Sequence, residues 1–412
     1  MKKTIFATVL VCVLSACNDE QKEKEIFPEG NSSVTIEVKQ PASTKSVGDQ
    51  KGDTEYAVLG SAKLYFLDNS YTSIFQRILT TTEVATLANS TSTPTSGNTV
   101  TITGIPSSSK YLYFMANIKT DPSQSYPAVE GTGSSDARLR LDRLQGAAQN
   151  VPMSGLSPAF TQIADNNYSA SVSISPILAR IEIGKVTCKN ITPGSPISSD
   201  ITGYKLSGVF INNLYQYVLL DGKPYSSSLV NITNQASWDT NWSTYFTNNV
   251  NFPHFAGGSP ASPSDWTANA FVNYCTPTAS GMIFYPDPTN GSSITNPGTT
   301  PLKAWTYQVS PSSQATTSTP VADMPHIILK LTDVTYVDNP LGPKTLFVVV
   351  SKYKMQGTSN NVLDFKRGNI YRIDDLSFDV TQATEKPYDK NISVTCSVTV
   401  NNWVINSIVP VW

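Results

Sequence analysis

Cys17 is the residue of this chain whose type and position point most directly to a defined chemical reaction. It ends the motif LSAC, residues 14–17, which follows two N-terminal lysines and a short apolar run. Small residues before a cysteine at this position match a lipoprotein signal peptidase site, where the thiol becomes the attachment point for diacylglycerol. The apolar run is too short to span a bilayer, so it indicates a secretory signal. The alternative is an ordinary signal peptide that contains a cysteine by chance.

The rest of the sequence contains no residue pattern that indicates catalysis. The chain has two histidines, His254 and His326, and neither has the spacing of a metal ligand or a nearby histidine partner. The sequence motifs of serine hydrolases, zinc proteases, P-loops and dinucleotide-binding turns are absent. We therefore expect no enzymatic activity, no cofactor and no metal site.

Composition and cysteine count exclude further classes of function. The formal net charge is −2 over 412 residues, which gives no electrostatic footprint for nucleic acid. Cys188, Cys275 and Cys396 remain once the signal and the lipidated cysteine are set aside. Three cysteines at wide spacing indicate neither a disulfide framework nor a zinc site.

The pattern of apolar residues predicts the fold. Nearly every apolar run is short, rich in β-branched or aromatic residues, and bounded by Ser, Thr, Asn, Gly or Pro. This predicts an all-β protein of two β-sandwich domains in tandem, with few short helices, of which 75–90 and 134–148 are the best candidates. The expected segments are a signal peptide (1–17), a tether and first strand (18–45), an N-terminal domain (46–188), a C-terminal domain (189–390) and C-terminal strands (391–412).

The last segment, 391–412, contains no Asp, Glu, Lys or Arg. Its apolar residues alternate with Ser, Thr and Asn, which is the period-two pattern of a strand with one apolar face. Left exposed, such a strand would promote aggregation, so it must be buried in its own molecule or in another. The apolar positions are Ile392, Val394, Cys396, Val398 and Val400.

The first predicted strand carries Val34, Ile36 and Val38 on one face. A polar linker follows it and contains Lys45 before Ser46, a flexible site that a trypsin-like protease could cut. Cleavage there would leave the first strand held by non-covalent contacts alone. The terminal strand offers five apolar positions where the first offers three, so the tail of a partner could replace the first strand.

Motifs along nearly the whole chain resemble those of one known family. The ending ISVTCSVTVNNWVINSIVPVW, with its cysteine, Trp403 and final Trp412, carries the strongest likeness. The other motifs are the signal peptidase site LSAC (the lipobox), SVTIEVK followed by STKSVGD, VTITGIPSSSKYLYFMANI, VPMSG, ILARIEIGKV and FKRGNIYRIDDL. In this order they resemble the fimbrillins, the major subunits of type V pili.

The resemblance implies two transthyretin-like sandwiches and a structural, adhesive role in a fimbrium at the cell surface. The lipidated precursor would reach the outer membrane, where an Arg- or Lys-specific protease removes the tether with its first strand. The open groove then receives the C-terminal strands of the next subunit, which is donor-strand exchange. Such head-to-tail contacts do not close, so they build a filament of pilin subunits, with accessory tip and anchor pilins.

The linker departs from the family pattern in its basic residues. The best-known members are cut after Arg, whereas this linker offers Lys39, Lys45 and Lys51. Lys45 aligns best, which puts the mature N-terminus at Ser46.

Two other interpretations remain open. A tip or anchor pilin of the same family is a close variant, although a tip subunit should lack a donor tail and an anchor should lack a cleavable linker. The second alternative is a monomeric surface lipoprotein that binds glycans through Trp238, Trp242 or Trp266. In that protein the tail would be an ordinary closing strand of its own fold.

Replacing Cys17 tests the lipoprotein interpretation. Cys17→Ala removes the thiol that would carry the lipid, so we expect the precursor to lose its membrane anchor and not to assemble. Membrane fractionation and mass spectrometry of the N-terminal peptide measure both effects. Normal fractionation of this variant would contradict the proposed secretion route.

Overall fold

The computed structural model describes residues 30–39, 56–88, 98–120, 129, 138–141, 151–183, 186–189, 201–230, 274–278, 281–285, 305–336, 344–379, 382–386, 394–402 and 404–406. Strands make up most of these residues, so the chain has the all-β fold that its sequence predicts. The helices in this part include α2 (Thr81–Ala88) and the short 3-10 helix η4 (Ser226–Ser228). None of the described helices is long and apolar enough to cross a membrane.

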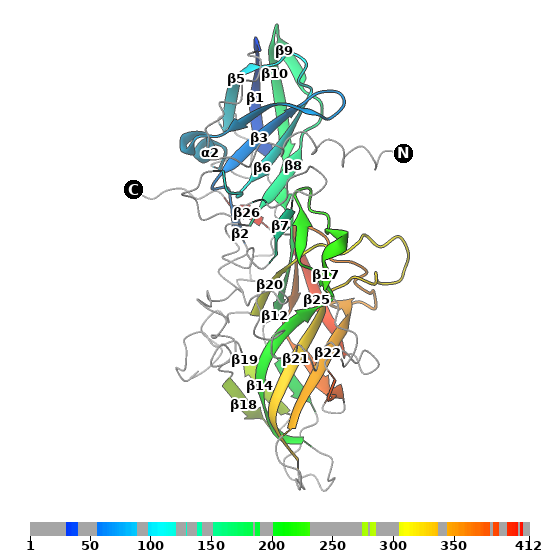
Figure 1. Cartoon of the computed structure of the whole chain (residues 1–412). Coiled ribbons are helices and arrows are strands. Elements are labelled where there is room, and N and C mark those ends of the chain that lie inside the picture. Colours follow the sequence, from blue (N-terminus) through cyan, green and yellow to red (C-terminus); the bar gives the residue numbers. More distant parts are fainter. Residues whose placement is uncertain are drawn as a thin grey trace, which may run out of the picture.

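Two sheets from the first part of the chain lie at one end of an elongated molecule (Figure 1). They share an apolar core that includes Leu64, Phe66 and Phe114. The four-stranded sheet has the order β5-β1-β10-β9, with β1 (Ser32–Lys39), β5 (Thr99–Ile105), β9 (Thr161–Ala164) and β10 (Asn167–Ser173). The five-stranded sheet has the order β11-β8-β6-β3-β4, with β3 (Ala62–Leu67), β4 (Ser73–Ile78), β6 (Tyr111–Ala116), β8 (Met153–Leu156) and β11 (Ser175–Pro176).

The two predicted helical stretches have different outcomes. In the first, 75–90, the prediction is wrong for residues 75–78, which belong to β4, and is confirmed for α2. There, α2 begins after a capping box in which the Thr80 amide donates to the Glu83 carboxylate at 2.6 Å and the Glu83 amide donates to the Thr80 hydroxyl at 3.3 Å. In the second, the prediction of a helix is wrong for β7 (Arg138–Arg140), which pairs with β16 (Tyr217–Leu219). This long-range pairing overrides the local helical pattern.

The second group of sheets is built from the later part of the chain. The seven-stranded sheet has the order β14-β21-β22-β25-β23-β12-β20, with β12 (Ala179–Ile183), β14 (Ile201–Asn212), β20 (Trp305–Val309), β21 (His326–Tyr336), β22 (Lys344–Met355), β23 (Asn369–Ile373) and β25 (Val394–Asn402). The four-stranded sheet has the order β18-β19-β13-β24, with β13 (Val186–Lys189), β18 (Tyr274–Thr278), β19 (Gly281–Tyr285) and β24 (Leu376–Asp379). Two short pairs remain: β15 (Leu214–Tyr215) with β17 (Leu229–Val230), and β2 (Tyr56–Val58) with β26 (Val404–Asn406).

Three charged residues are buried in the seven-stranded sheet. Glu182 on β12 accepts from Arg180 Nε at 2.7 Å through one carboxylate oxygen. Its other oxygen accepts from Arg372 Nη2 on β23 at 2.8 Å. Buried charges are tolerated when they are paired and hydrogen-bonded in this way.

The strand pairing changes partners between β11 and β12. β11 pairs with β8 in the first group, whereas β12 pairs with β20 and β23 in the second, and β13 pairs with β19 and β24. Most strands therefore change partners near residue 178, within about ten residues of the expected domain boundary at residue 188, which stays a prediction. The Pro- and Gly-rich stretch that suggests a boundary at 188 follows the first two strands of the second group.

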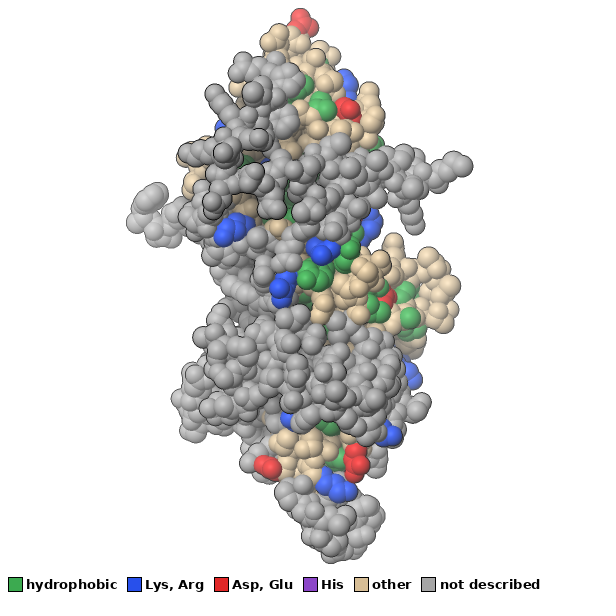
Figure 2. Space-filling view, viewed as in Figure 1, with side chains coloured by type: hydrophobic (Ala, Val, Ile, Leu, Met, Phe, Trp, Pro, Cys, Tyr) green, Lys and Arg blue, Asp and Glu red, His purple; other side chains and the backbone are tan. Residues whose placement is uncertain are grey.

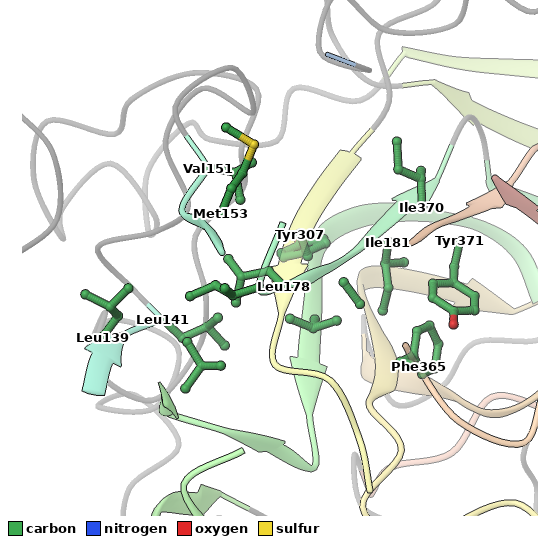
Figure 3. Close-up of a cluster of buried hydrophobic side chains, with 14 of the residues drawn as sticks. Leu139, Leu141, Val151, Met153, Leu178, Ile181, Tyr307, Phe365, Ile370 and Tyr371 are labelled. Atoms are coloured by element: carbon green, nitrogen blue, oxygen red, sulfur yellow. The ribbon is translucent and has the colours of Figure 1, made fainter. Parts of the chain in front are cut away.

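The apolar core continues from the first group into the second. Leu178 is fully buried just before β12, and Figure 3 shows it beside Tyr307 of β20, with Val151 and Met153 on its other side. Tyr113 of β6 donates from its hydroxyl to the Leu220 carbonyl at 3.0 Å. Burial raises the pKa of Tyr113 to about 12, so the hydroxyl keeps the proton that this bond needs.

Arg367 makes several hydrogen bonds that connect the two groups of sheets. Its Nη2 donates to the carbonyls of Ser154 at 3.0 Å and Ser175 at 2.9 Å, on strands of the first group. Its Nη1 donates to the carbonyl of Asp221 at 2.7 Å, in the turn after β16. Gly222, with φ of +83°, closes that turn, and a Cβ there would lie 3.1 Å from the Arg367 Cδ.

Removing the Arg367 guanidinium is expected to weaken the protein. Arg367→Met keeps the apolar stem but leaves several carbonyl groups without their donor, so the free energy of unfolding should fall by about 2–4 kcal/mol. Urea denaturation measures this change. Lys366→Met removes a charge from an exposed neighbour and should change stability by less than about 0.5 kcal/mol. Equal effects of the two substitutions would contradict a linking role for Arg367.

Candidate functional site

The first strand, β1, lies between two other strands of its sheet. It pairs antiparallel with β5, with Ile36 opposite Val100, and parallel with β10, with Ile36 opposite Ala170. Both edges of β1 are thus hydrogen-bonded along the ladder. Removing β1 would open a groove between β5 and β10.

The inward face of β1 is completely buried. Val34, Ile36 and Val38 are 0%, 0% and 1% exposed, as their alternation with polar residues predicts. Burial of three aliphatic side chains stabilises the sheet by roughly 5–9 kcal/mol. Their neighbours across the ladders include Ile102, Val100, Ala170 and Val172, which would line the open groove.

The fourth inward residue of β1 is polar. Ser32 is 3% exposed, and its hydroxyl is a buried oxygen without a hydrogen-bond partner among the described residues. A buried hydroxyl in this state costs about 1–3 kcal/mol. An apolar side chain in its place would remove that cost.

The outward face of β1 is polar and partly exposed. The Ser33 hydroxyl donates to the Asn167 side chain, and the hydroxyls of Thr35 and Thr101 lie 3.0 Å apart. These contacts connect β1 to β10 and β5 on the side away from the core. They involve common polar side chains, so a different polar strand could make similar ones.

The covalent connections of β1 make it separable. It is the first of the described strands in the chain, and β2 begins only at Tyr56. Gly30, just before β1, packs against the backbone at the end of β5. A Cβ at residue 30 would lie only 1.9 Å from the Ile105 carbonyl oxygen, so a larger residue would not fit there. One cut within residues 40–55 would break the covalent connection between β1 and the later strands without cutting another described strand.

The C-terminal strand, β25, occupies a central place in the seven-stranded sheet. It pairs parallel with β22 and antiparallel with β23. Val398 is 1% exposed whereas Ser397 is exposed, which is the alternation expected of these two residues. The backbone of Val394, Cys396 and Val400 lies in the same strand. After β25, the short strand β26 pairs parallel with β2.

Several predicted site residues lie outside the described part of the chain: Cys17, Lys45, Ser46, Ile392, Trp403, Trp238, Trp242 and Trp266. Lipidation, processing and glycan contact at these residues stay predictions. His326 is buried at the start of β21, and the described residues contain no group of three or more His, Cys, Asp and Glu that could hold a metal ion.

The neighbours of β25 and the pairing of β2 with β26 do not follow from the sequence pattern. The residues of β22 and β23 have clear strand patterns, but nothing local indicates that β25 inserts between them. Strand β2, residues 56–58, which pairs with β26, is not predicted either. Its only signal is a three-residue strand pattern after the polar linker, which is too short to interpret.

Comparisons with known proteins give similarity at the level of structure. No protein-family model matches the chain, and no curated protein matches it. A candidate cell adhesion protein from Bacteroides eggerthii DSM 20697 is 17% identical, with a TM-score of 0.45, over 92% of this chain and 98% of that one. A fimbrilin (fimA) from Porphyromonas gingivalis W83 is 14% identical, with a TM-score of 0.44, over 92% and 99%. The tip fimbrial protein Mfa3 from Porphyromonas gingivalis is 9% identical, with a TM-score of 0.36, over 90% and 99%.

A charge on the inward face of β1 tests its burial. Ile36→Asp places a carboxylate in the core, so the free energy of unfolding should fall by about 3–5 kcal/mol. Thr35→Asp places the same group on the outward face and should cost about 1 kcal/mol or less. Thermal and urea unfolding of the uncut protein measure both. Similar losses from the two variants would mean that β1 is not seated as described.

Proposed function

We propose that this chain is a non-catalytic stalk subunit of a surface fimbrium, exported as a lipoprotein and polymerised by donor-strand exchange. The observation that carries the proposal is β1: a strand at the start of the fold, hydrogen-bonded on both sides, whose apolar row completes a core. Cleavage after Lys45 would free it together with the lipid on Cys17. The strand of another subunit would then fill its groove.

The energetics of exchange support this proposal. The groove requires apolar side chains at every second position, which the row from Ile392 to Val400 supplies. A strand with an apolar residue at the position of Ser32 would also remove a buried hydroxyl without a partner among the described residues. An incoming tail can therefore bind at least as well as the strand that it replaces.

The proposed donor is the C-terminal segment, 391–412, of a second copy. To donate Val394, Cys396, Val398 and Val400, β25 must leave its ladders with β22 and β23. The groove of the neighbour then provides two equivalent ladders. Trp403 follows directly and would lie at the end of the inserted strand.

The proposal also assigns partners and a location. Identical subunits would form a head-to-tail polymer, because the groove lies at one end of the chain and the donor at the other. Accessory tip and anchor pilins would complete the fibre. The other partners are a trypsin-like Arg- or Lys-specific protease and the outer membrane, to which the lipid holds the precursor at the cell surface.

One observation favours a second candidate function. β25 is already a central strand of its own sheet, with Val398 buried, as in a monomer whose tail closes the fold. In that case the chain would be a surface lipoprotein, and Trp238, Trp242 or Trp266 would contact glycans. Assembly experiments separate the two candidates.

Treating the purified precursor with trypsin tests the proposal. We expect one cut in residues 40–55, an N-terminus at Ser46, loss of β1, and filaments visible by electron microscopy. N-terminal sequencing of the filaments identifies the cut. Assembled material that still begins at Cys17 would contradict strand removal, whereas a start after Lys39 or Lys51 would only move the site.

Two truncations define the donor. A chain that ends at Lys390 lacks β25 and the residues after it, and we expect no filaments from it. A chain that ends at Asn402 keeps β25. Filaments from this chain would assign the donor role to β25, and their absence would assign part of it to residues 403–412. Filaments from the chain that ends at Lys390 would exclude the tail as donor. Failure of that chain to fold would favour the closed monomer.

A further inference from the structure

The C-terminal strand β25 is held in its own sheet on both sides. Its edges are paired with β22 and β23, and the Val398 side chain is 1% exposed. A strand in this position does not leave unless the structure around it opens. The segments that cover β25 therefore decide when the tail of the chain becomes available.

One of these segments is the connection between β22 and β23. β22 ends at Met355 and β23 begins at Asn369, and these strands lie on opposite sides of β25. Residues 356–368 therefore have to cross β25. Where the crossing begins, the Gln356 amide donates to the Val398 carbonyl at 2.9 Å. The connection is thus attached to the backbone of β25 at its start.

Phe365 marks the point at which this connection passes over β25. The centroid of its ring lies 5.2 Å from that of Tyr353 on β22 and 4.2 Å from that of Tyr371 on β23 (Figure 3). The two tyrosines lie opposite the residues of β25 that are two positions before and two positions after Val398. Alternate residues of a strand share one face, so Phe365 covers the inward face of β25.

Hydrogen bonds hold the crossing segment in place. The Phe365 amide donates to the Ser312 hydroxyl at 2.6 Å, and the Ser312 amide donates to the Phe365 carbonyl at 3.0 Å. The Lys366 amide donates to the Tyr371 hydroxyl at 2.7 Å. Residues 363–367 thus form a fixed segment over β25, which we call the strap.

The strap ends at Arg367, which binds the first group of sheets. Its Nη2 donates to the Ser175 carbonyl at 2.9 Å, and its Nε donates to the Pro176 carbonyl at 3.3 Å, both on β11. Figure 2 shows basic and apolar side chains at the surface where the two groups of sheets meet. Water therefore reaches the rim of this junction, and it can replace Arg367 as the donor to these carbonyls if β11 shifts.

The strand that the strap binds, β11, comes directly after the part of β10 that depends on β1. The ladder of β10 with β9 ends at Ser169, whereas its ladder with β1 extends to Ser173. The Ile174 amide then donates to the Lys39 carbonyl at 3.2 Å. Without β1, residues 170–174 have no paired strand among those described. β11 stays paired with β8, so its carbonyls would shift relative to the strap without being released.

We infer that the strap retains β25 in its own sheet, and that the loss of β1 loosens the strap through β11 and Arg367. The intact precursor then keeps its tail closed, and the processed chain frees it. This inference rests on the proposed function for the departure of β1, and it adds a control on β25. Coupling between distant sites requires an element with two arrangements that both sites bias, and the strap is that element.

Hydrogen exchange of the uncut full chain measures the hold of the strap. Mass spectrometry follows the amides of β25, and those of β21 report general unfolding of the second group. We expect Arg367→Met to speed exchange in β25 about tenfold relative to β21, because the strap loses its bonds to the first group. Lys366→Met removes an exposed neighbouring charge and should leave the ratio unchanged. Equal acceleration of β25 and β21 by Arg367→Met would overturn the role of the strap.

A matched pair of substitutions in β1 tests the coupling in the same uncut chain. Val38 is buried beside Lys39, and Val34 is equally buried near the other end of the strand. Val38→Ala loosens the end of β1 next to β11, so the exchange ratio of β25 to β21 should rise severalfold, whereas Val34→Ala should leave it unchanged. In the Arg367→Met background, Val38→Ala should add nothing. Equal ratios for the two valine variants, or additive effects of Val38→Ala and Arg367→Met, would overturn the inference.

Trypsin treatment separates this inference from the proposed function. In dilute processed chain, cleared of filaments by centrifugation, the exchange ratio should rise once β1 has left. Filaments that form while the ratio stays unchanged would overturn the inference and leave donor-strand exchange intact. A processed chain that keeps β1, or that forms no filaments, would refute the proposed function, and the valine variants of the uncut chain would still decide the inference.

Discussion

The burial of β1 is the constraint on which the rest of the structure depends. Its inward row, Val34, Ile36 and Val38, fills the core of the first group of sheets, and its backbone completes the ladders of β5 and β10. Without an occupant at this position, two strand edges and an apolar groove would face water, which is the condition that promotes strand addition. The contacts of β1 with this core are non-covalent, so a strand of another chain with the same alternation could make similar ones, without the effective concentration that the covalent connection gives to β1.

The C-terminal strand β25 satisfies an equivalent requirement in the second group. It has the same alternation, with Val398 inward and Ser397 outward, and two neighbouring strands complete its hydrogen bonds. Under the proposed function a segment with this pattern would fit either groove, because burial of aliphatic side chains and ladder hydrogen bonds depend little on which chain supplies the groove. The proposed exchange would require the first strand to leave its groove and the C-terminal strand to fit in either of two grooves.

Polar and apolar contacts join the two groups of sheets into one connected structure. Arg367 donates to carbonyls of Ser154, Ser175 and Asp221, and the β7–β16 pair adds a second connection. The core also continues from Met153 through Leu178 to Tyr307 (Figure 3). Carbonyl groups at strand ends need donors when they are buried, and a guanidinium group can serve several of them at once. Tension applied at one end would therefore pass through a packed and hydrogen-bonded junction.

The sequence by itself determined the fold class and the faces of individual strands. Alternation of apolar and polar residues is a local property of the pleated backbone, so this alternation alone assigns Val34, Ile36, Val38 and Val398 to buried faces. The helix expected around residue 138 is wrong at β7 because a strand more than seventy residues away pairs with it.

Only the tertiary structure decided which strands became neighbours. It placed β25 between β22 and β23, put β12 beside β20, and buried Arg180 and Glu182 together. These outcomes depend on contacts between residues far apart in the chain. The pattern of a strand indicates that it needs neighbouring strands to pair with. It does not indicate which strand edges will pair with it, because the backbone hydrogen-bonding groups of all strands are alike.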